Sequence, residues 1–547
     1  MGSGDTDTHA RTGGAGGGMG GAGTRTGGAD TNQFVPAADG VALATDVYFH
    51  DRLPAPVVVT RTPYGRSALL ANGLGWARNG FVHVVQDVRG RYGSEGSWTP
   101  YHHERADGRA LVEWVRAQPW CDGNVILAGA SYGSFTAWSA ALAAPGLVRA
   151  VISEVPAAVL RPANVEPSGI LRLAEYVGWW TEHADGRTSR DGLSAQMLRA
   201  RPQLLHHLPV AGIGGCLWAR LPHWWSTIDP DGPGRGQTPA HAEALDDQEL
   251  AACALPSLHI GGWYDLFLPQ TLHQWTVAGS GHDPRPARGL VVGPWQHELS
   301  TPHSHSAGGR DHGRESQLPL GALQVDWISR VLAGEDASIT KIFLMEDGRW
   351  LDHWPASTGV LRLHATADGA LSSSLPERAA EHRFTYDPLD PFPSLFPSLP
   401  VHHDRGSLDV RRDSVTFRGL PLTNPLAVAG SPTVRLAVGT TAPSADWIVR
   451  LVQRFDDGRA FEITSGSAVA ERGVRTLDVV LGATALVLRP GSRLELHITG
   501  SDFPRLARNL NTGSDRYTSS VTRTATQTVR SGPAHGCFVD LPVMERQ

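Results

Sequence analysis

The chain has few cysteines and almost no lysine. Its four cysteines are widely spaced and form no CxxC pair, which argues against a zinc ribbon or a redox dithiol. Scattered cysteines of this kind favour a reduced, cytoplasmic setting. Lys341 is the only lysine, and arginine carries the remaining basic side-chain charge, a bias that we attribute to genome composition.

Charge of one sign and long apolar runs are also lacking. The formal net charge is −6 and no block of basic residues occurs, so neither nucleic acid nor a membrane is an expected partner. No run of about 18 apolar residues is present, which argues against a transmembrane helix. Residues 1–30 are dominated by glycine and lack the apolar stretch of a secretory signal, so we expect a disordered tail there.

The remaining sequence divides into segments of different periodicity, and 547 residues are too many for one hydrophobic core. Short β-branched runs alternate with helical patterns in residues 31–150 and 245–365, which indicates an α/β domain with a parallel sheet. Residues 151–244 are rich in tryptophan and have helix-like segments, so they predict an inserted helical cap. Residues 366–547 contain short strands separated by turns and predict an all-β sandwich.

A serine stands between two glycines at a point where a strand gives way to a helix. Gly129-Ala130-Ser131-Tyr132-Gly133 fits G-x-S-x-G, after the apolar run NVIL and before a helical pattern. In this context the motif is typical of a nucleophile elbow, which exposes the serine hydroxyl at the carboxyl edge of the sheet. The backbone N–H of Tyr132 can then face an oxyanion. The alternative is an ordinary serine in a glycine-rich turn.

Two further strand ends supply partners for this serine. Asp265 follows the strand LPSLHI, and His297 follows the strand GLVV. Hydrolases with a nucleophile elbow use the chain order Ser, Asp, His, so we interpret His297 as the base for Ser131 and Asp265 as the carboxylate that orients it. Each residue alone has an ordinary alternative, a capping aspartate or a surface histidine. The joint order and the strand-end placement favour the triad.

Several motifs occur in one order along the chain: RTPYG, DVRGRYGSEG, GASYGSFTAW, GWYDLF, GPWQH and FPRLARNLNTG. In this respect the chain resembles the cocaine esterase-like acyl hydrolases of the X-Pro dipeptidyl-peptidase (S15) superfamily, over nearly its whole length after residue 31. The resemblance implies an α/β-hydrolase core with an inserted helical cap and a C-terminal all-β jelly roll. It places Ser131, Asp265 and His297 on the family's triad. It places Tyr64 on the tyrosine whose hydroxyl shares the oxyanion hole with the Tyr132 N–H.

The resemblance also bears on the substrate. Amino-ester hydrolases of the superfamily carry carboxylates just after the catalytic aspartate, and this chain has none there. Unless Glu175 or another cap acid substitutes, a substrate amine would lack a partner, so we expect an ester without one. Phe267 stands where the aryl esterases carry phenylalanine, and with Trp179, Trp180 and Trp263 it predicts an aromatic-lined pocket. Packing in a hydrophobic core is the alternative for each tryptophan.

We therefore predict a serine esterase or acyl hydrolase that cleaves a carboxylic ester, or an amide, through an acyl-enzyme. The open alternatives are an X-Pro dipeptidyl-peptidase or aminoacyl amide hydrolase, an acyltransferase of secondary metabolism, and a non-enzymatic ligand-binding protein. No cofactor is expected, and no metal, because His303, His305 and His312 lack the spacing of a tight site. The expected partner is a small-molecule ester or amide substrate, and the choice between monomer and homodimer stays open.

Overall fold

The computed structural model describes residues 28–157, 164–184, 186–216, 243–299, 304–395, 404–534 and 536–545. Nearly all of the predicted disordered tail lies outside these residues, as do His303 and the cap tryptophans Trp218, Trp224 and Trp225. The first strand begins at Ala29, inside the predicted tail, because Ala29 pairs with Tyr48. No described helix is both long and apolar enough to cross a membrane.

The α/β domain is built on a ten-stranded sheet with the order β1-β2-β4-β3-β5-β6-β7-β8-β11-β12. The strands from β4 to β11 run parallel, and β1, β2 and β12 add antiparallel edges. Their bounds are β1 (Ala29–Pro36), β2 (Ala42–Tyr48), β3 (Ala55–Thr62), β4 (Val82–Asp87), β5 (Cys121–Ala130), β6 (Ala150–Glu154), β7 (Ser257–Gly262), β8 (Arg288–Gly293), β11 (Ile339–Leu344) and β12 (Arg349–Leu351). A short hairpin, β9 (Ser306–Ala307) and β10 (Arg310–Asp311), lies outside this sheet.

Helices cover both faces of the sheet, as buried parallel strands require. Alternate residues of β3 point to opposite faces: Val57 and Val59 pack with α2 and α3, whereas Val58 packs with α1 and α10. The helices of this domain are α1 (Leu70–Arg78), α2 (Glu104–Arg116), α3 (Tyr132–Ala143), α8 (Asp247–Ala252), α9 (Leu268–Val277) and α10 (Leu320–Ala333), with short turns η1 (Arg66–Leu69) and η5 (Arg314–Ser316).

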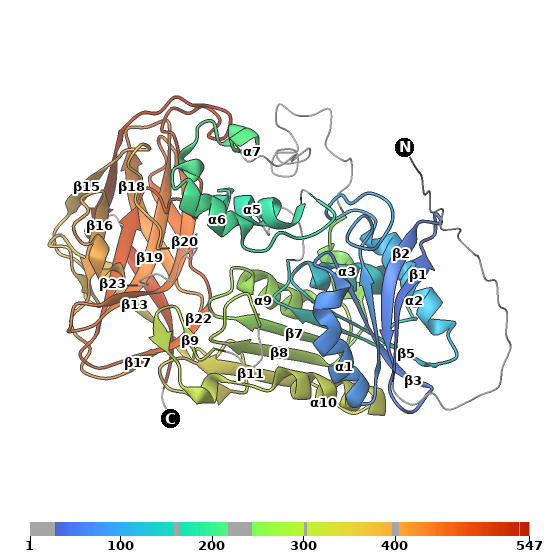
Figure 1. Cartoon of the computed structure of the whole chain (residues 1–547). Helices are drawn as coiled ribbons and strands as arrows, with labels where there is room; N and C mark the ends of the chain where they lie inside the picture. Colours follow the sequence, from blue (N-terminus) through green and yellow to red (C-terminus); the bar gives the residue numbers. More distant parts are fainter. Residues whose placement is uncertain are drawn as a thin grey trace, which may run out of the picture.

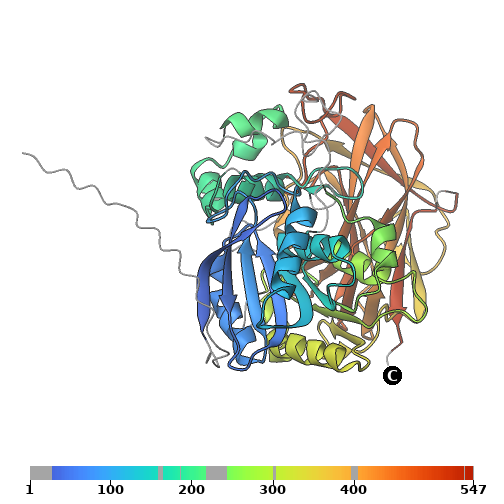
Figure 2. The same cartoon turned by 90° about the vertical axis from the view of Figure 1, so that its right-hand side faces the viewer.

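The cap is inserted between β6 and β7. It comprises α5 (Leu173–Trp179), η2 (Trp180–Ala184), α6 (Leu193–Ala200), η3 (Leu204–His206), η4 (Val210–Gly212) and α7 (Ile213–Cys216). In Figures 1 and 2 the cap lies at the top of the molecule and α10 at the bottom, with the sheet between them. The cap core also contains Phe503 and Ala507 from the C-terminal domain. Backbone hydrogen bonds join the same parts, from Ala174 N to Pro504 O, from Ala507 N to Leu171 O and from Ala211 N to Tyr517 O.

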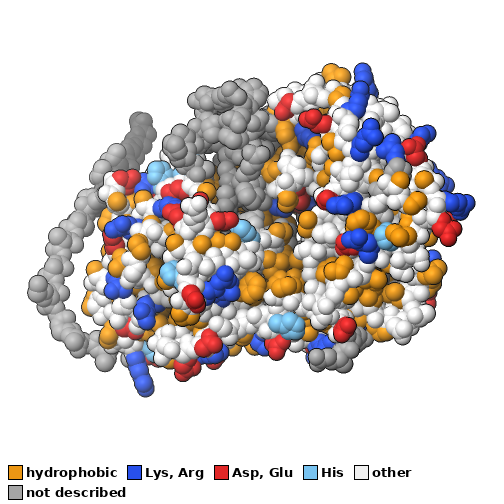
Figure 3. Space-filling model, turned by 180° about the vertical axis from the view of Figure 1, so that it is seen from behind, with side chains coloured by type: hydrophobic (Ala, Val, Ile, Leu, Met, Phe, Trp, Pro, Cys, Tyr) orange, Lys and Arg blue, Asp and Glu red, His pale blue; other side chains and the backbone are white. Residues whose placement is uncertain are grey.

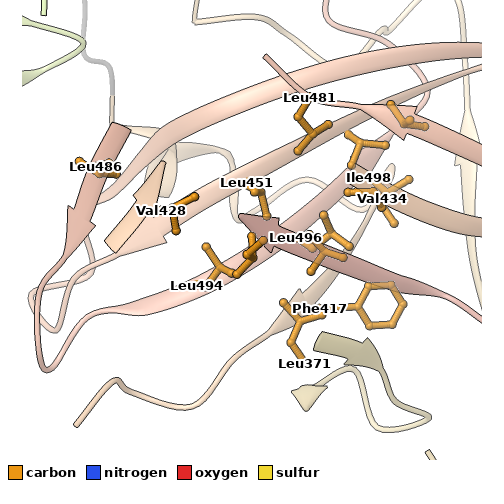
Figure 4. Packing of buried hydrophobic residues seen from close by; sticks show 14 of the residues in the cluster. Leu371, Phe417, Val428, Val434, Leu451, Leu481, Leu486, Leu494, Leu496 and Ile498 are labelled. Carbon is orange, nitrogen blue, oxygen red and sulfur yellow. The ribbon is translucent and has the colours of Figure 1, made fainter. Parts of the chain in front are cut away.

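The C-terminal domain is a β-sandwich whose leucine-, valine- and phenylalanine-rich core is shown in Figure 4. One sheet contains β14-β13-β25-β18-β24-β15, with β17, β21 and β22 attached, and the other has the order β16-β23-β19-β20. The strands are β13 (Gly359–Ala365), β14 (Leu371–Ser372), β15 (Ala380–Tyr386), β16 (Ser414–Arg418), β17 (Leu426–Gly430), β18 (Thr433–Thr440), β19 (Ser444–Arg454), β20 (Ala460–Glu471), β21 (Thr476–Val480), β22 (Thr484–Leu488), β23 (Arg493–Thr499), β24 (Ala525–Ser531) and β25 (Phe538–Met544), with the turn η6 (Arg405–Leu408).

The sandwich begins earlier in the chain than predicted. Strand β13 precedes the predicted boundary at residue 366, yet it pairs along its length with β25 and so belongs to the sandwich. The sandwich also continues the core of the α/β domain: Met345, just after β11, exchanges backbone hydrogen bonds with Ala485 and Val487. The predicted fold class is confirmed, with an α/β core, an inserted helical cap and a C-terminal all-β domain.

The surface carries charges of both signs. On the face shown in Figure 3, acidic and basic side chains are interspersed rather than gathered into separate fields. This distribution agrees with the small net charge of −6.

Candidate active site

Ser131 occupies a sharp turn between β5 and α3. Its backbone has φ 56° and ψ −122°, a conformation that non-glycine residues rarely adopt. The turn brings the strand and the helix so close that a Cβ on Gly129 would lie 2.2 Å from the carbonyl oxygen of Gly133. The Ser131 N–H donates to Glu154 O at 2.9 Å, which ties the turn to β6. The glycine at position 129 is therefore a steric requirement of the elbow.

The structure brings Asp265 and His297 to this serine. His297 Nε2 lies 3.0 Å from Ser131 Oγ, and His297 Nδ1 lies 2.9 Å from Asp265 Oδ1. The Asp265 side chain is fully buried, whereas that of His297 is 31% exposed. Because a carboxylate only accepts hydrogen bonds, Nδ1 carries the proton and Nε2 is left to accept from the Ser131 hydroxyl. This arrangement can remove a proton from Ser131.

Tyr64 lies beside the same serine. Burial raises the pKa of the Tyr64 hydroxyl, while hydrogen bonds with the Ser131 hydroxyl, the Trp179 indole and the backbone N–H of Tyr132 oppose that rise. The Trp179 Nε1–H donates to the Tyr64 oxygen at 3.3 Å. The Tyr64 hydroxyl and the Tyr132 N–H therefore lie together next to Ser131, where two such donors can stabilise a negatively charged oxygen.

A cavity of about 310 Å³ opens onto these groups. Ser131, His297 and Tyr64 line this cavity, and two of the predicted aromatic residues, Trp179 and Phe267, form part of its wall. The Phe267 ring also packs edge-on against the His297 ring, with centroids 5.0 Å apart. Much of the remaining wall consists of apolar side chains of the cap: Val177, Met197, Leu198 and Leu204.

Two predicted pocket residues are not part of this wall, and their placement is corrected. Trp180 is 1% exposed and packs in the cap core against Tyr176. Trp263 donates from Nε1 to Phe343 O at 2.8 Å and packs against Trp354, in the core shared with the sandwich. Both tryptophans pack in hydrophobic cores, which was the alternative interpretation of these positions in the sequence.

Two polar side chains, those of Glu175 and Tyr101, also form part of the cavity wall. Glu175 lines the cavity, and its buried Oε2 has no hydrogen-bond partner among the described residues. Burial raises the pKa of Glu175 to about 7, against the opposing effect of Arg505. Tyr101 also lines the cavity but was not predicted, because it lies in a loop with no motif and no periodicity.

The glycine-rich segment DVRGRYGSEG (residues 87–96) forms hydrogen bonds both with Pro63 and with the cap. Arg91 is fully buried and donates from Nε to Pro63 O at 2.9 Å and from Nη2 to Ser189 Oγ at 3.1 Å. The Tyr92 hydroxyl accepts from Ser189 N at 3.0 Å. Since Pro63 immediately precedes Tyr64, this segment connects Tyr64 to the cap.

One group in the cap has the composition of a metal site. The ligand atoms of Glu182, His183 and Asp191 lie within 4.8 Å of one another. Protein partners already engage two of them: Glu182 accepts from Ser194, and His183 Nδ1 bonds the Ser189 hydroxyl. Of the histidines considered from the sequence, His305 pairs with Asp311 and His312 with Ala307 O, so these two do not converge on a common site.

The chain is similar to known protein families over most of its length. A family model described as X-Pro dipeptidyl-peptidase (S15 family) matches residues 39–298, and one for the X-Pro dipeptidyl-peptidase C-terminal non-catalytic domain matches residues 335–540. The cocaine esterase of Rhodococcus sp. (strain MB1 Bresler) is 30% identical over an alignment that covers 94% of this chain and 98% of that relative.

Solved structures share the fold. An α-amino acid ester hydrolase superposes with a TM-score of 0.77 at 20% identity, covering 95% of this chain and 97% of the other. A CocE/NonD family hydrolase from Staphylococcus aureus superposes with a TM-score of 0.63 at 15% identity, covering 94% of each chain.

Proposed function

The chain belongs to the X-Pro dipeptidyl-peptidase (S15) family and is a hydrolase that acts on esters, and we propose that it does so through an acyl-enzyme on Ser131. One observation carries the proposal: an unbroken hydrogen-bond chain from Asp265 through His297 to Ser131, at the edge of a partly aromatic cavity. The substrate is a carboxylic ester whose acyl group contacts Trp179 and Phe267.

Acylation uses the groups around the serine. His297 Nε2 takes the Ser131 proton as Oγ attacks the ester carbonyl, and Asp265 stabilises the imidazolium. The carbonyl oxygen becomes an oxyanion that accepts hydrogen bonds from the Tyr64 hydroxyl and the Tyr132 N–H. The tetrahedral intermediate then expels the alcohol, which leaves with the proton from His297. Water, activated by the same histidine, hydrolyses the acyl-enzyme and restores Ser131.

The Ser131→Ala variant tests this mechanism against wild type. We expect it to fold normally and to lose at least about 1,000-fold in kcat on p-nitrophenyl acetate, butyrate and benzoate. Near-normal turnover by the variant would remove Ser131 from the mechanism. Product analysis with added alcohol or amine separates hydrolysis from acyl transfer. A wild type that neither hydrolyses esters nor reacts with a serine-directed phosphonate would be a binding protein instead.

A second candidate function is favoured by Glu175. Its unpartnered, buried carboxylate oxygen on the cavity wall would gain a strong partner from a substrate ammonium group. On this alternative the enzyme acts on aminoacyl esters or amides, or removes X-Pro dipeptides, and the cap supplies the carboxylate that is missing after Asp265.

The two candidates are separated by a matched pair of esters, methyl phenylglycinate and methyl phenylacetate, with Gly-Pro-p-nitroanilide as a third substrate. If Glu175 binds an ammonium group, the Glu175→Gln variant should raise KM for the phenylglycinate by about 10- to 100-fold, the worth of a charged hydrogen bond. KM for the phenylacetate should not change. If Glu175→Gln changes KM for the two esters by the same factor, the second candidate is excluded and the enzyme is an acyl esterase that does not bind a substrate ammonium group.

A further inference from the structure

A buried carboxylate lies beneath the oxyanion site. Glu104, the first residue of α2, is 2% exposed, and its Oε1 accepts from the Tyr132 hydroxyl at 2.9 Å. The same hydroxyl accepts from the backbone N–H of Tyr101 at 2.6 Å. The Tyr132 side chain is fully buried, so these two bonds hold it from both sides.

The other oxygen of Glu104 holds a second part of the site. Arg61 Nη1 donates to Glu104 Oε2 at 2.7 Å and to the Glu104 backbone oxygen at 3.1 Å. Arg61 is 3% exposed and lies on β3, the strand that leads directly into Tyr64. Burial raises the pKa of Glu104 to about 7, and the Arg61 charge opposes that rise.

One carboxylate thus links the two chain segments that carry the oxyanion donors. One donor is the backbone N–H of Tyr132, whose hydroxyl bonds Glu104. The other is the hydroxyl of Tyr64, which follows the strand that bears Arg61. We propose that Glu104 is a positioning residue that sets the separation of these two donors by holding the Tyr132 hydroxyl and the Arg61 guanidinium together. This inference rests on the proposed function, because it concerns an oxyanion formed during ester hydrolysis.

The physical need for such a residue follows from the backbone at Ser131. A left-handed, non-glycine residue persists only where its surroundings over-determine it, and Tyr132 is its immediate neighbour. Donors that are already in place stabilise the oxyanion without reorganisation, and a displacement of about 1 Å can lower the rate by about 100-fold. Anchoring Tyr132 through its side chain keeps its N–H directed at the reacting carbonyl.

The Tyr132→Phe variant removes the anchored hydroxyl and leaves the backbone N–H. We expect kcat to fall by about 10-fold or more while KM changes by less than about 2-fold, because only the transition state uses the oxyanion donors. Phenylboronic acid gives an independent measurement. Its boron accepts the Ser131 oxygen, the proton passes to His297, and the resulting tetrahedral anion occupies the oxyanion site. Its inhibition constant should rise by the same factor as kcat falls.

Four further variants complete the experiment. Glu104→Gln keeps an acceptor for the Tyr132 hydroxyl and should retain more kcat than Glu104→Leu. In the Tyr132→Phe background, Glu104→Gln should lower kcat less than it does alone, because the contact with the Tyr132 hydroxyl is already absent and only the contact with Arg61 is weakened. The control Tyr386→Phe removes another buried tyrosine hydroxyl, which donates to Asn509 O at 3.0 Å in the sandwich, and should leave kcat unchanged.

Two results would contradict the inference. An active wild type whose Tyr132→Phe variant keeps kcat and the phenylboronic acid constant within about 2-fold would show that the anchor does not position the donors. Equal losses in Tyr132→Phe and Tyr386→Phe would show a general effect of stability. A wild type that hydrolyses no ester and binds no phenylboronic acid would instead overturn the proposed function itself.

Discussion

At the scale of single residues, the backbone conformation of Ser131, the proposed nucleophile, depends on the absence of a side chain at Gly129. The left-handed backbone of Ser131 costs about 1–3 kcal/mol of strain, which surrounding contacts must offset. Gly129 is part of that compensation, because its missing Cβ lets the Gly133 carbonyl approach. The elbow is thus maintained by steric fit on one side and by the Tyr132 anchor on the other.

The Gly129→Ala variant should test this fit. Its methyl group would meet backbone atoms that cannot move independently, so we expect a lower Tm, a loss of about 1–3 kcal/mol in the free energy of unfolding, and reduced kcat. Gly75→Ala is the matched control. No atom lies within 4 Å of a Cβ at Gly75, in the middle of α1, and alanine there should stabilise by about 0.5–1 kcal/mol. Normal activity and Tm in Gly129→Ala would show that the turn relaxes without it.

Short motifs were sufficient to predict the residues around the serine. The strand-turn-helix context of Ser131 and the strand ends at Asp265 and His297 are local features, and the sheet edge then brings them together. Glu104 and Tyr101 gave no such signal. Glu104 reads as an ordinary charge at the start of a helix, and its contact with Tyr132 depends on how α2 packs against α3.

At the scale of elements, the cap reaches the reacting groups through α5. Trp179, the last residue of this helix, donates its indole N–H to the Tyr64 oxygen, and His183 from the following turn packs edge-on against the Tyr64 ring at 5.0 Å. A donor to the phenol oxygen makes the phenol a better donor in turn. We therefore expect the cap to act on the proposed oxyanion site as well as to line the cavity.

A double-mutant cycle measures this effect. Tyr64→Phe should lower kcat by about 100-fold or more, the usual loss for one oxyanion donor. Trp179→Phe keeps an aromatic wall but removes the N–H, and should lower kcat by about 3- to 10-fold, as expected for one neutral hydrogen bond. In the Tyr64→Phe background the second change should have almost no effect. Additive effects in the cycle would mean that Trp179 only lines the cavity.

The helical pattern of the cap could not separate its two adjacent tryptophans. Consecutive residues of a helix point about 100° apart, so Trp179 can face the cavity while Trp180 enters the cap core. Both are apolar positions in a segment covered on two sides, and composition alone does not distinguish them. Trp263 was misplaced for a related reason, since its partners Phe343 and Trp354 come from distant parts of the chain.

At the scale of the whole molecule, two buried histidines make stability depend on pH. Burial lowers the pKa of His83 to about 3, and burial together with the Arg288 charge does the same for His259. Both ordinarily titrate near 6.5 in an unfolded chain. As the pH falls from 6.5 towards 3, these two histidines bind protons in the unfolded chain but stay neutral in the native protein. Each histidine then removes about 1.4 kcal/mol of stability for every pH unit.

Thermal melts of wild type and His259→Gln at pH 7, 6 and 5 should show this dependence. The variant should lose less Tm between pH 7 and pH 5 than wild type, whatever its starting Tm, because one proton-binding site is gone from the unfolded chain. Parallel slopes for wild type and His259→Gln would contradict the explanation.

The contact between the cap and the sandwich limits how the cap can be exchanged between related proteins in evolution. The chemistry comes from strand ends of the α/β domain, while much of the cavity wall comes from the insertion, so exchange of the insertion between relatives could change selectivity in one step. The cap core, however, includes Phe503 and Ala507, and the backbones meet at Ala174 with Pro504 and at Leu171 with Ala507. A cap transferred from a relative would bring only its own side of the interface with the sandwich. The segment from Phe503 to Arg508 must be transferred with it, although more than 250 residues separate this segment from the end of the cap at residue 244.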